Sequence, residues 1–323
     1  MADQQPQVVS GLQLWQWRNQ AIQAAIAAAV PPLEVDWLLQ EIAGLDRLAL
    51  RLESFKDWSE IPITMSLADL EQLWQKRLRD RLPVQYIAGV TPWRKFKLAV
   101  SSAVLIPRPE TECLIDLAVA AIAQSQAINL LDQGHWVDLG TGSGAIAIGL
   151  ADALPKAKIH AVDYSTAALE IAQTNAKNLG FADRIHFYQG SWWEPLTTLK
   201  GQVSGMVSNP PYIPTETVAT LEPEVKQHEP HLALDGGADG LDDIHYLVEV
   251  SPSYLRPGGV WLIEMMAGQA GAVRELLQNQ GSYCDIQIHT DLEGVERFAL
   301  AYVSVKGNRE QGTGNREQGI GDR

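Results

Sequence analysis

From residue 134 onward the sequence alternates between short apolar runs and longer amphipathic segments, and this alternation constrains the fold most. Runs such as HWVDLG, KIHAVD and VSGMVSN have the length and composition of buried strands. The segment STAALEIAQTNAKNLG between two strands predicts a helix, with Ser165 as its N-cap and Gly180 as its terminator. Strands that alternate with helices favour a doubly wound α/β sheet with helices on both faces.

The sequence before this part predicts helices instead. Across residues 8–82 an amphipathic spacing of apolar residues connects Leu38, Ile42, Leu45 and Ala49. Ser66, followed three residues later by Asp69, predicts the start of another helix. We therefore expect a small helical domain ahead of the α/β domain.

Two further segments separate from these domains by composition. Residues 84–107 are rich in aromatic and β-branched residues, and FKLAV and AVLI flank Ser101-Ser102, which predicts a β-hairpin there. After Val305 the hexapeptide GNREQG occurs twice among almost no apolar residues, which predicts a disordered tail. We therefore divide the chain into four parts: a helical N-terminal domain (residues 1–83), a hairpin linker (84–107), an α/β domain (108–304) and a repeat tail (305–323).

The charge balance argues against one class of partner. The chain has 25 Lys and Arg residues against 39 Asp and Glu residues, a net charge of −14. General affinity for a nucleic-acid backbone comes mainly from Lys and Arg, so we expect no stable binding of nucleic acid. Residues 76–97 depart from this balance, with seven basic residues and one acid. This stretch is either a solvated helix face with a hairpin or a docking surface for an acidic protein domain.

The cysteines and the termini indicate a cytoplasmic protein without a membrane segment. Cys113 and Cys284 are too few for a disulfide framework and form no metal motif, so we expect reduced, buried thiols. The N-terminus lacks the pattern of a secretory signal, and the most apolar stretch, residues 24–30, is far too short to cross a membrane. His228 and His231 lack the spacing of a metal site, so no metal is expected.

A glycine-rich run, DLGTGSG, lies between the first strand of the α/β part and the helix that follows. Glycines at this place allow a tight turn and let a ligand approach the backbone, and no Lys-Ser/Thr pair follows to make a phosphate loop. Asp163 ends the next strand, where its carboxylate can accept both hydroxyls of a ribose or merely cap the helix near Ser165. The glycine-rich loop and Asp163 together predict a binding site for a nucleoside cofactor. The D-x-G-x-G-x-G pattern of the loop resembles the S-adenosylmethionine site of class I methyltransferases.

The tetrapeptide Asn209-Pro210-Pro211-Tyr212 ends the fourth strand, at the edge where open α/β sheets bind ligands. The prolines offer carbonyl acceptors only, and Asn209 is held extended and adds an amide oxygen. Tyr212 can lay its ring over a planar group. Such a site suits a planar –NH2 group whose two hydrogens must be held while its nitrogen attacks an electrophilic methyl group.

With these motifs in order, the chain resembles the release-factor glutamine methyltransferase family over residues 10–304. The resemblance rests on Gln85-Tyr86-Ile87-Ala88-Gly89, IPRPETE at residues 106–112, DLGTGSG, Asp163, NPPY, and Glu229-Pro230 with Gly236-Gly237 and Gly240-Leu241. IPRPETE together with NPPY is highly specific, whereas NPPY alone also resembles adenine-N6 methyltransferases. The resemblance implies a seven-stranded class I S-adenosylmethionine-dependent methyltransferase domain at residues 108–304, behind a helical substrate-docking domain.

The resemblance also implies a substrate and a set of site residues. The substrate is the glutamine of the Gly-Gly-Gln motif in peptide chain release factors, methylated on its side-chain amide. The residues implied to bind the cofactor S-adenosylmethionine are Gly140, Thr141, Gly142, Ser143, Gly144, Asp163, Trp192 and Asn209. Catalysis is implied for Asn209, Pro210 and Tyr212, which with Pro211 would also bind the substrate glutamine.

Some positions depart from the family pattern or allow more than one interpretation. Ser191 stands where many members carry an acidic residue near the adenine, and Met265-Met266 replace a smaller residue and glycine. Arg108, between two prolines, either forms a buried ion pair with Glu110 or Glu112 or orders a lid over the cofactor.

Three other functions compete with this one. A glutamine methyltransferase acting on a ribosomal protein differs little in sequence. An adenine-N6 nucleic-acid methyltransferase would need a basic groove and a recognition domain, which the acidic chain does not show. A non-catalytic cofactor-binding regulator is disfavoured by the intact NPPY and glycine loop.

Overall fold

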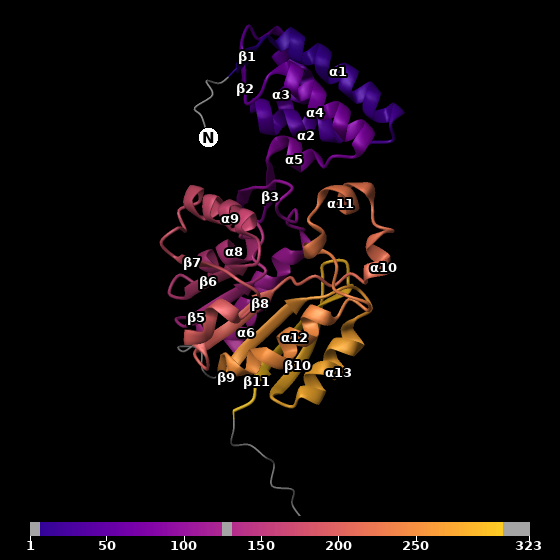
Figure 1. Cartoon of the computed structure of the whole chain (residues 1–323). Coiled ribbons are helices and arrows are strands. Elements are labelled where there is room, and N and C mark those ends of the chain that lie inside the picture. Colours follow the sequence, from indigo (N-terminus) through magenta and orange to yellow (C-terminus); the bar gives the residue numbers. More distant parts are fainter. Residues whose placement is uncertain (1–6, 125–130, 306–323) are drawn as a thin grey trace, which may run out of the picture.

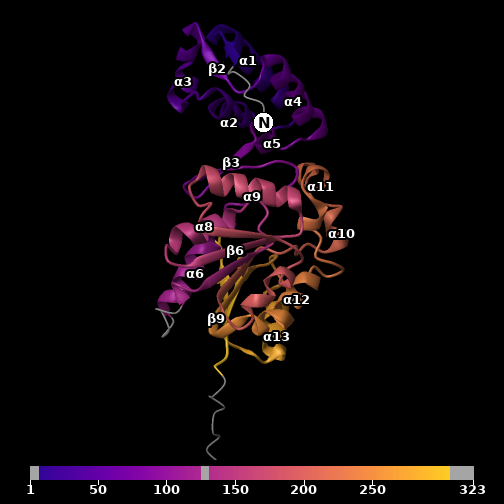
Figure 2. The same cartoon turned by 60° about the vertical axis from the view of Figure 1, so that its left-hand side comes forward.

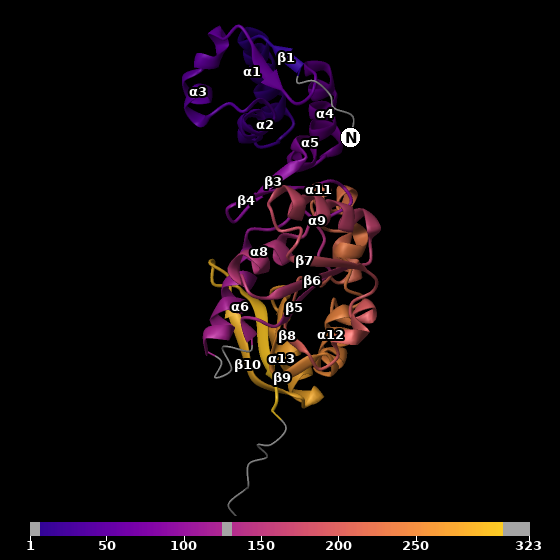
Figure 3. The same ribbon diagram turned by 90° about the vertical axis from the view of Figure 1, so that its left-hand side faces the viewer.

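The computed structural model describes residues 7–124 and 131–305, so most of the predicted tail lies outside the described residues. Figure 1 shows a small, mainly helical body above a larger α/β body. Figure 2 and Figure 3 show the same arrangement from two other sides, with a narrow connection through β3.

The N-terminal body is mainly helical, as expected. Its helices are α1 (Gly11–Ala27), α2 (Leu33–Ala43), α3 (Arg47–Leu52), α4 (Leu67–Asp80) and α5 (Val84–Ala88). The α4 N-cap is confirmed, since Ser66 accepts a hydrogen bond from the Asp69 amide. The sequence analysis missed a two-stranded antiparallel sheet of β1 (Gln7–Val9) and β2 (Ile61–Ile63). Three residues are too few to give a detectable alternation.

A β-hairpin connects the two bodies within residues 84–107, as predicted, but its turn was predicted at the wrong place. β3 (Val90–Trp93) pairs with β4 (Phe96–Ala99), so the turn lies at Arg94-Lys95 and not at Ser101-Ser102. The run AVLI forms no strand. Val104 in this run is buried with Val100 and Ala168 in a small apolar cluster, so side-chain packing rather than strand pairing explains its apolar character.

The larger body contains the seven-stranded sheet that the resemblance implied. The strand order is β10-β11-β9-β8-β5-β6-β7, in which β11 alone runs antiparallel to its neighbours. The strands are β5 (His135–Leu139), β6 (Lys158–Asp163), β7 (Ile185–Gln189), β8 (Val203–Ser208), β9 (Leu255–Glu264), β10 (Tyr283–Thr290) and β11 (Glu296–Val303). The predicted α/β fold class is therefore confirmed.

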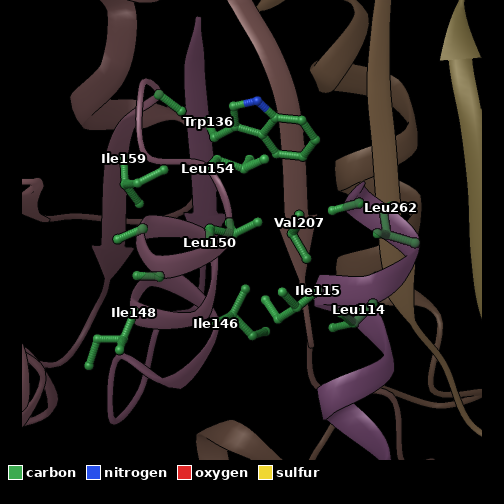
Figure 4. Close-up of a cluster of buried hydrophobic side chains, with 14 of the residues drawn as sticks. Leu114, Ile115, Trp136, Ile146, Ile148, Leu150, Leu154, Ile159, Val207 and Leu262 are labelled. Atoms are coloured by element: carbon green, nitrogen blue, oxygen red, sulfur yellow. The ribbon is translucent and has the colours of Figure 1, made fainter. Parts of the chain in front are cut away.

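Helices cover both faces of the sheet. On one face α6 (Cys113–Gln124) and α8 (Ala145–Ala153) pack on the strands through apolar side chains, part of which Figure 4 shows around Trp136 and Val207. On the other face lie α12 (Asp242–Val250) and α13 (Ala270–Gln280). α9 (Thr166–Asn178) begins at Ser165 as predicted, because the Ser165 hydroxyl accepts from the Ala168 amide.

The strand order places the predicted motifs at one edge. β5 lies between β6 and β8, with Leu139 opposite both Val162 and Ser208. The glycine loop after β5, Asp163 at the end of β6 and Asn209 after β8 therefore meet at the carboxyl edge. The chain changes direction across the sheet here, and open α/β sheets bind ligands at such a switch point.

The two cysteines lie closer to the surface than expected. The cysteines are unpaired but not buried as predicted: Cys113 is partly exposed and Cys284 lies exposed on β10. No helix in the described ranges is long and apolar enough to cross a membrane.

Candidate functional site

A cavity of about 640 Å³ opens at the carboxyl edge of the sheet, within the range typical of ligand pockets. The predicted site residues that line it are Gly140, Thr141, Gly142, Ser143, Asp163, Trp192, Asn209 and Pro211. The other three predicted residues, Gly144, Pro210 and Tyr212, are not among the residues that line the cavity. Gly144 precedes α8, Pro210 is buried, and the Tyr212 hydroxyl points to a buried carboxylate.

The glycine loop is held close to the sheet by backbone hydrogen bonds. The amides of Gly140 and Thr141 both donate to the Val162 carbonyl at 2.9 Å. Gly144 has a φ of +84°, and a Cβ there would lie 3.1 Å from the Cβ of Ala172 on α9. A side chain at this position would thus strain the backbone and crowd the helix, so glycine lets α9 pack directly against the loop.

Asp138, which opens the glycine motif, anchors the loop from below. Its buried Oδ2 accepts from the Thr141 hydroxyl at 2.6 Å and from the Ala147 amide at 3.0 Å. Burial raises the pKa of Asp138 from its ordinary value to about 7, although both hydrogen bonds oppose the change. The carboxylate joins the loop to the first turn of α8.

Asp163 contacts the start of the next helix, as one of the two alternatives expected, and its side chain also lines the cavity, while the ribose role stays a prediction. Its Oδ1 accepts from the Ser165 amide at 2.9 Å, which ties it to the start of α9. Its Oδ2 accepts from the Gly142 amide at 2.8 Å, and the side chain also lines the cavity. Burial raises the pKa of Asp163, while the backbone donors counteract part of that effect. Asp163 therefore orders the loop and presents a carboxylate to the cavity.

The Trp192 ring lies beside the glycine loop. A Cβ on Gly140 would be 3.5 Å from this ring, so the ring closely approaches the loop backbone. The indole N–H donates to Asp243 Oδ1 at 3.2 Å, and Asp243 itself lines the cavity. Trp192 has a φ of +49°, which is uncommon for a bulky residue. The sequence analysis did not predict Asp243, which has no motif of its own.

A hydrogen-bonded network supports the NPPY segment from behind. Asn209 Nδ2 donates to Thr111 Oγ1 at 3.3 Å, and the Thr111 hydroxyl donates to Glu264 Oε2 at 2.7 Å. The Tyr212 hydroxyl donates to the other oxygen of Glu264 at 2.9 Å. Because the Asn209 amide nitrogen is engaged by Thr111, Oδ1 is the acceptor that this side chain offers elsewhere. Glu264 thus connects both ends of the tetrapeptide.

Glu264 ends β9 and is completely buried. Burial raises its pKa from 4.5 to about 7, although the hydrogen bonds from Thr111 and Tyr212 oppose the shift. Burial and the nearby Glu264 also raise the pKa of Tyr212 well above its ordinary value, so this hydroxyl stays protonated. The sequence analysis missed Glu264 and Thr111 as site residues. The available signal was a single carboxylate at the end of an otherwise apolar strand.

Arg108 lines the cavity and pairs with Glu229, which was not expected as its partner. Its Nη2 lies 2.8 Å from Oε1 and 2.9 Å from Oε2 of Glu229, so the alternative of an ion pair with Glu110 or Glu112 is wrong. Glu229 is brought close by the long segment after NPPY, which returns to the cavity rim. Arg108 thus holds that segment to the rim, consistent with the alternative in which it orders a lid.

The basic stretch 76–97 is largely neutralised within the chain. Six of its seven basic side chains form ion pairs with carboxylates: Arg77, Arg79, Arg81, Arg94, Lys95 and Lys97. These pairs leave little free positive charge for an acidic partner. Docking of a partner by this stretch stays a prediction.

Comparisons with known proteins agree with this geometry. A model of the Methyltransferase small domain family matches residues 115–237. The release factor glutamine methyltransferase of Synechocystis sp. is 53% identical over 293 residues, covering 91% of this chain and 97% of that protein. The chain belongs to the release factor glutamine methyltransferase family.

A second relative supports the same assignment, and a solved structure supports the fold. The release factor glutamine methyltransferase of Thermosynechococcus vestitus is 48% identical, covering 83% of this chain and 90% of that protein. The crystal structure of the hMettl16 catalytic domain is 15% identical with a TM-score of 0.52, covering 77% of this chain and 86% of that one. At this identity the second likeness supports the methyltransferase fold alone.

Proposed function

We propose that the protein transfers the methyl group of S-adenosylmethionine to the side-chain amide nitrogen of the glutamine in the Gly-Gly-Gln motif of peptide chain release factors. The observation that carries this proposal is the convergence of the glycine loop, Asp163 and NPPY on one cavity, in a chain of this family. Because its substrates take part in translation, we propose that the enzyme works in the cytoplasm.

The residues around the cavity fit the proposed cofactor. The glycine loop brings backbone close to the cavity without side chains, which suits the methionine end. Asp163 offers a carboxylate for the ribose hydroxyls, and the Trp192 ring offers a flat face near the adenine. Asp243 adds an acceptor beside Trp192, although Ser191 carries no charge. Bound S-adenosylmethionine would supply an electrophilic methyl group at this site.

Asn209 and the prolines would hold the substrate amide. A glutamine side-chain amide is a poor nucleophile because its nitrogen lone pair is delocalised. Oδ1 of Asn209 and the carbonyl of Pro210 would accept its two hydrogens and so orient the nitrogen toward the methyl group. These acceptors would also stabilise the positive charge that develops on the nitrogen. The proton would leave after methyl transfer, so the site requires no strong general base.

The hydrogen-bonded network behind NPPY would hold these acceptors of the substrate amide in a fixed orientation. Thr111 orients the Asn209 amide, and Glu264 fixes both Thr111 and Tyr212. Hydrogen-bonded second partners of this kind hold functional side chains in a single orientation. In this proposal Glu264 is a positioning residue, since it is buried behind the tetrapeptide.

Asp163→Ala should weaken the binding of S-adenosylmethionine more than it affects folding. Hydrogen bonds to a charged group contribute roughly 1.5–3 kcal/mol, which predicts a loss of affinity of about ten- to hundredfold. Calorimetric titration measures this loss, with Asp183→Ala as a control because Asp183 is exposed and precedes β7. An unchanged affinity in Asp163→Ala would refute the ribose role.

The proposed reaction is tested by transfer of a labelled methyl group from S-adenosylmethionine. The substrates are a purified release factor, the same factor with its Gly-Gly-Gln glutamine changed to alanine, and duplex DNA. We expect label on the intact factor only. Label on DNA would mean that the substrate is a nucleic acid and not a release factor. If neither the release factor nor the DNA is labelled although the cofactor binds, a ribosomal-protein substrate or a non-catalytic regulator would be favoured.

A further inference from the structure

The segment between Tyr212 and Gly236 forms an excursion over the cavity, which we call the lid (residues 213–235). It contains two short helices, α10 (Thr215–Val218) and α11 (Pro223–His228). Its two ends are joined at the base, since the Ile213 amide donates to the Leu234 carbonyl and the Gly236 amide to the Ile213 carbonyl. Its inner rim, residues 230–233, lines the cavity.

The lid has almost no apolar core of its own. Within the lid only Val218, Glu229 and Leu234 are buried, with Leu234 at the base where the two ends meet, and α11 buries none of its residues. Segments with few buried apolar contacts open at low free energy unless polar contacts hold them. The position of the lid over the cavity therefore depends on its ion pairs and hydrogen bonds.

The outer side of the lid is held by the N-terminal domain. Figures 1 and 2 show α11 at the top of the larger body, facing the helical body. Arg77 of α4 binds Glu224 of α11 at 2.7 Å, and Arg81 binds the same oxygen at 3.0 Å. His228 Nε2 lies 2.6 Å from the Asp80 carbonyl. Three polar contacts thus join the end of α4 to α11.

Arg77 is well suited to fix this contact. It is buried, and its guanidinium also forms a two-pronged pair with Glu34 of α2, at 2.7 and 2.8 Å. The second pair orients the guanidinium before the lid is engaged, so little conformational freedom is lost on binding Glu224. On the inner side Arg108 holds Glu229, which lies five positions after Glu224 in the chain.

We propose that Arg77, together with Arg81, is a positioning residue: by binding Glu224, this end of α4 lets the N-terminal domain set the lid over the cofactor cavity. Because the lid buries few apolar side chains of its own, this contact links the orientation of α4 to the position of the rim at residues 230–233. The consequence for cofactor binding rests on the proposed function, whereas the consequence for the lid does not.

Glu224→Ala tests this proposal and leaves the pair of Arg77 with Glu34 in the N-terminal domain in place, and Glu222→Ala is its matched control. Glu222 lies two residues away, and its side chain makes no capping hydrogen bond. Hydrogen exchange by mass spectrometry reports on the lid, and calorimetry reports on S-adenosylmethionine. In Glu224→Ala we expect faster exchange in residues 222–234, unchanged protection of the Gly236 amide at the base, and an affinity roughly three- to tenfold weaker.

The outcomes separate a positioning role from a merely structural one. Exchange in the lid that is equal in Glu224→Ala and Glu222→Ala would overturn the proposal. Faster lid exchange with an unchanged cofactor affinity would also overturn it, because the lid would then move without consequence for the cavity. A failure of the proposed cofactor site is recognised separately, since Asp163→Ala, in which the lid contacts are intact, would then leave the cofactor affinity unchanged.

Discussion

Asn209→Ala is expected to lower the rate of methyl transfer by about 10²- to 10³-fold while the protein stays folded. Removing one preorganised group that stabilises charge in a transition state typically costs that much. The truncated side chain can neither accept a hydrogen of the substrate amide nor bind Thr111. Single-turnover transfer to a release factor measures the loss, and thermal unfolding shows whether the fold is retained.

The matched control for this substitution is Asn279→Ala, because Asn279 is exposed on α13, outside the cavity lining. It should leave transfer unchanged. Near-normal turnover in Asn209→Ala would mean that the amide grip is assigned to the wrong residue. A loss of turnover that is accompanied by unfolding would instead indicate a structural role in the network with Thr111 and Glu264.

Glu264→Gln is expected to make the protein more stable than the wild type at alkaline pH. The pKa of Glu264 is about 7 in the folded protein against an ordinary value of 4.5. Between these two pH values the folded state binds more protons than the unfolded state, so the free energy of unfolding falls as the pH rises. At ~1.4 kcal/mol per pKa unit, the full effect of this group is about 3 kcal/mol above pH 7.

The glutamine side chain in that variant has no proton to lose, yet its amide can still bond both Thr111 and Tyr212. We expect urea unfolding to give similar free energies of unfolding for the variant and the wild type near pH 4. As the pH rises to 8.5, the variant should become increasingly more stable than the wild type. Asp138, whose pKa is also raised to about 7, is present in both proteins. The free energy of unfolding should therefore still fall somewhat with rising pH in the variant. Glu275→Gln, at an exposed position of α13, is the control. If the free energy of unfolding changed equally with pH in Glu264→Gln and in the wild type, Glu264 would be ionised in the folded protein throughout this pH range.

The parts of the fold that follow local rules were predicted from the sequence. The α/β alternation, the Ser165 cap and the position of the glycine loop depend on periodicity and turn chemistry, which act over a few residues. The hairpin turn was misplaced, because the apolar run after Ser101-Ser102 is apolar for packing against α9 and not for pairing. β1 and β2 were missed because such short strands form only where a partner about 50 residues away is brought beside them.

The site divides in the same way. By itself the sequence determined which motifs the chain carries and, through the order of strands and helices, that they gather at one sheet edge. Only the tertiary structure decided their partners. Thr111 meets Glu264 across 153 positions, Arg108 meets Glu229 across 121 and Arg77 meets Glu224 across 147. No local pattern encodes such pairs, because they depend on how separate elements pack and on which charges that packing buries together.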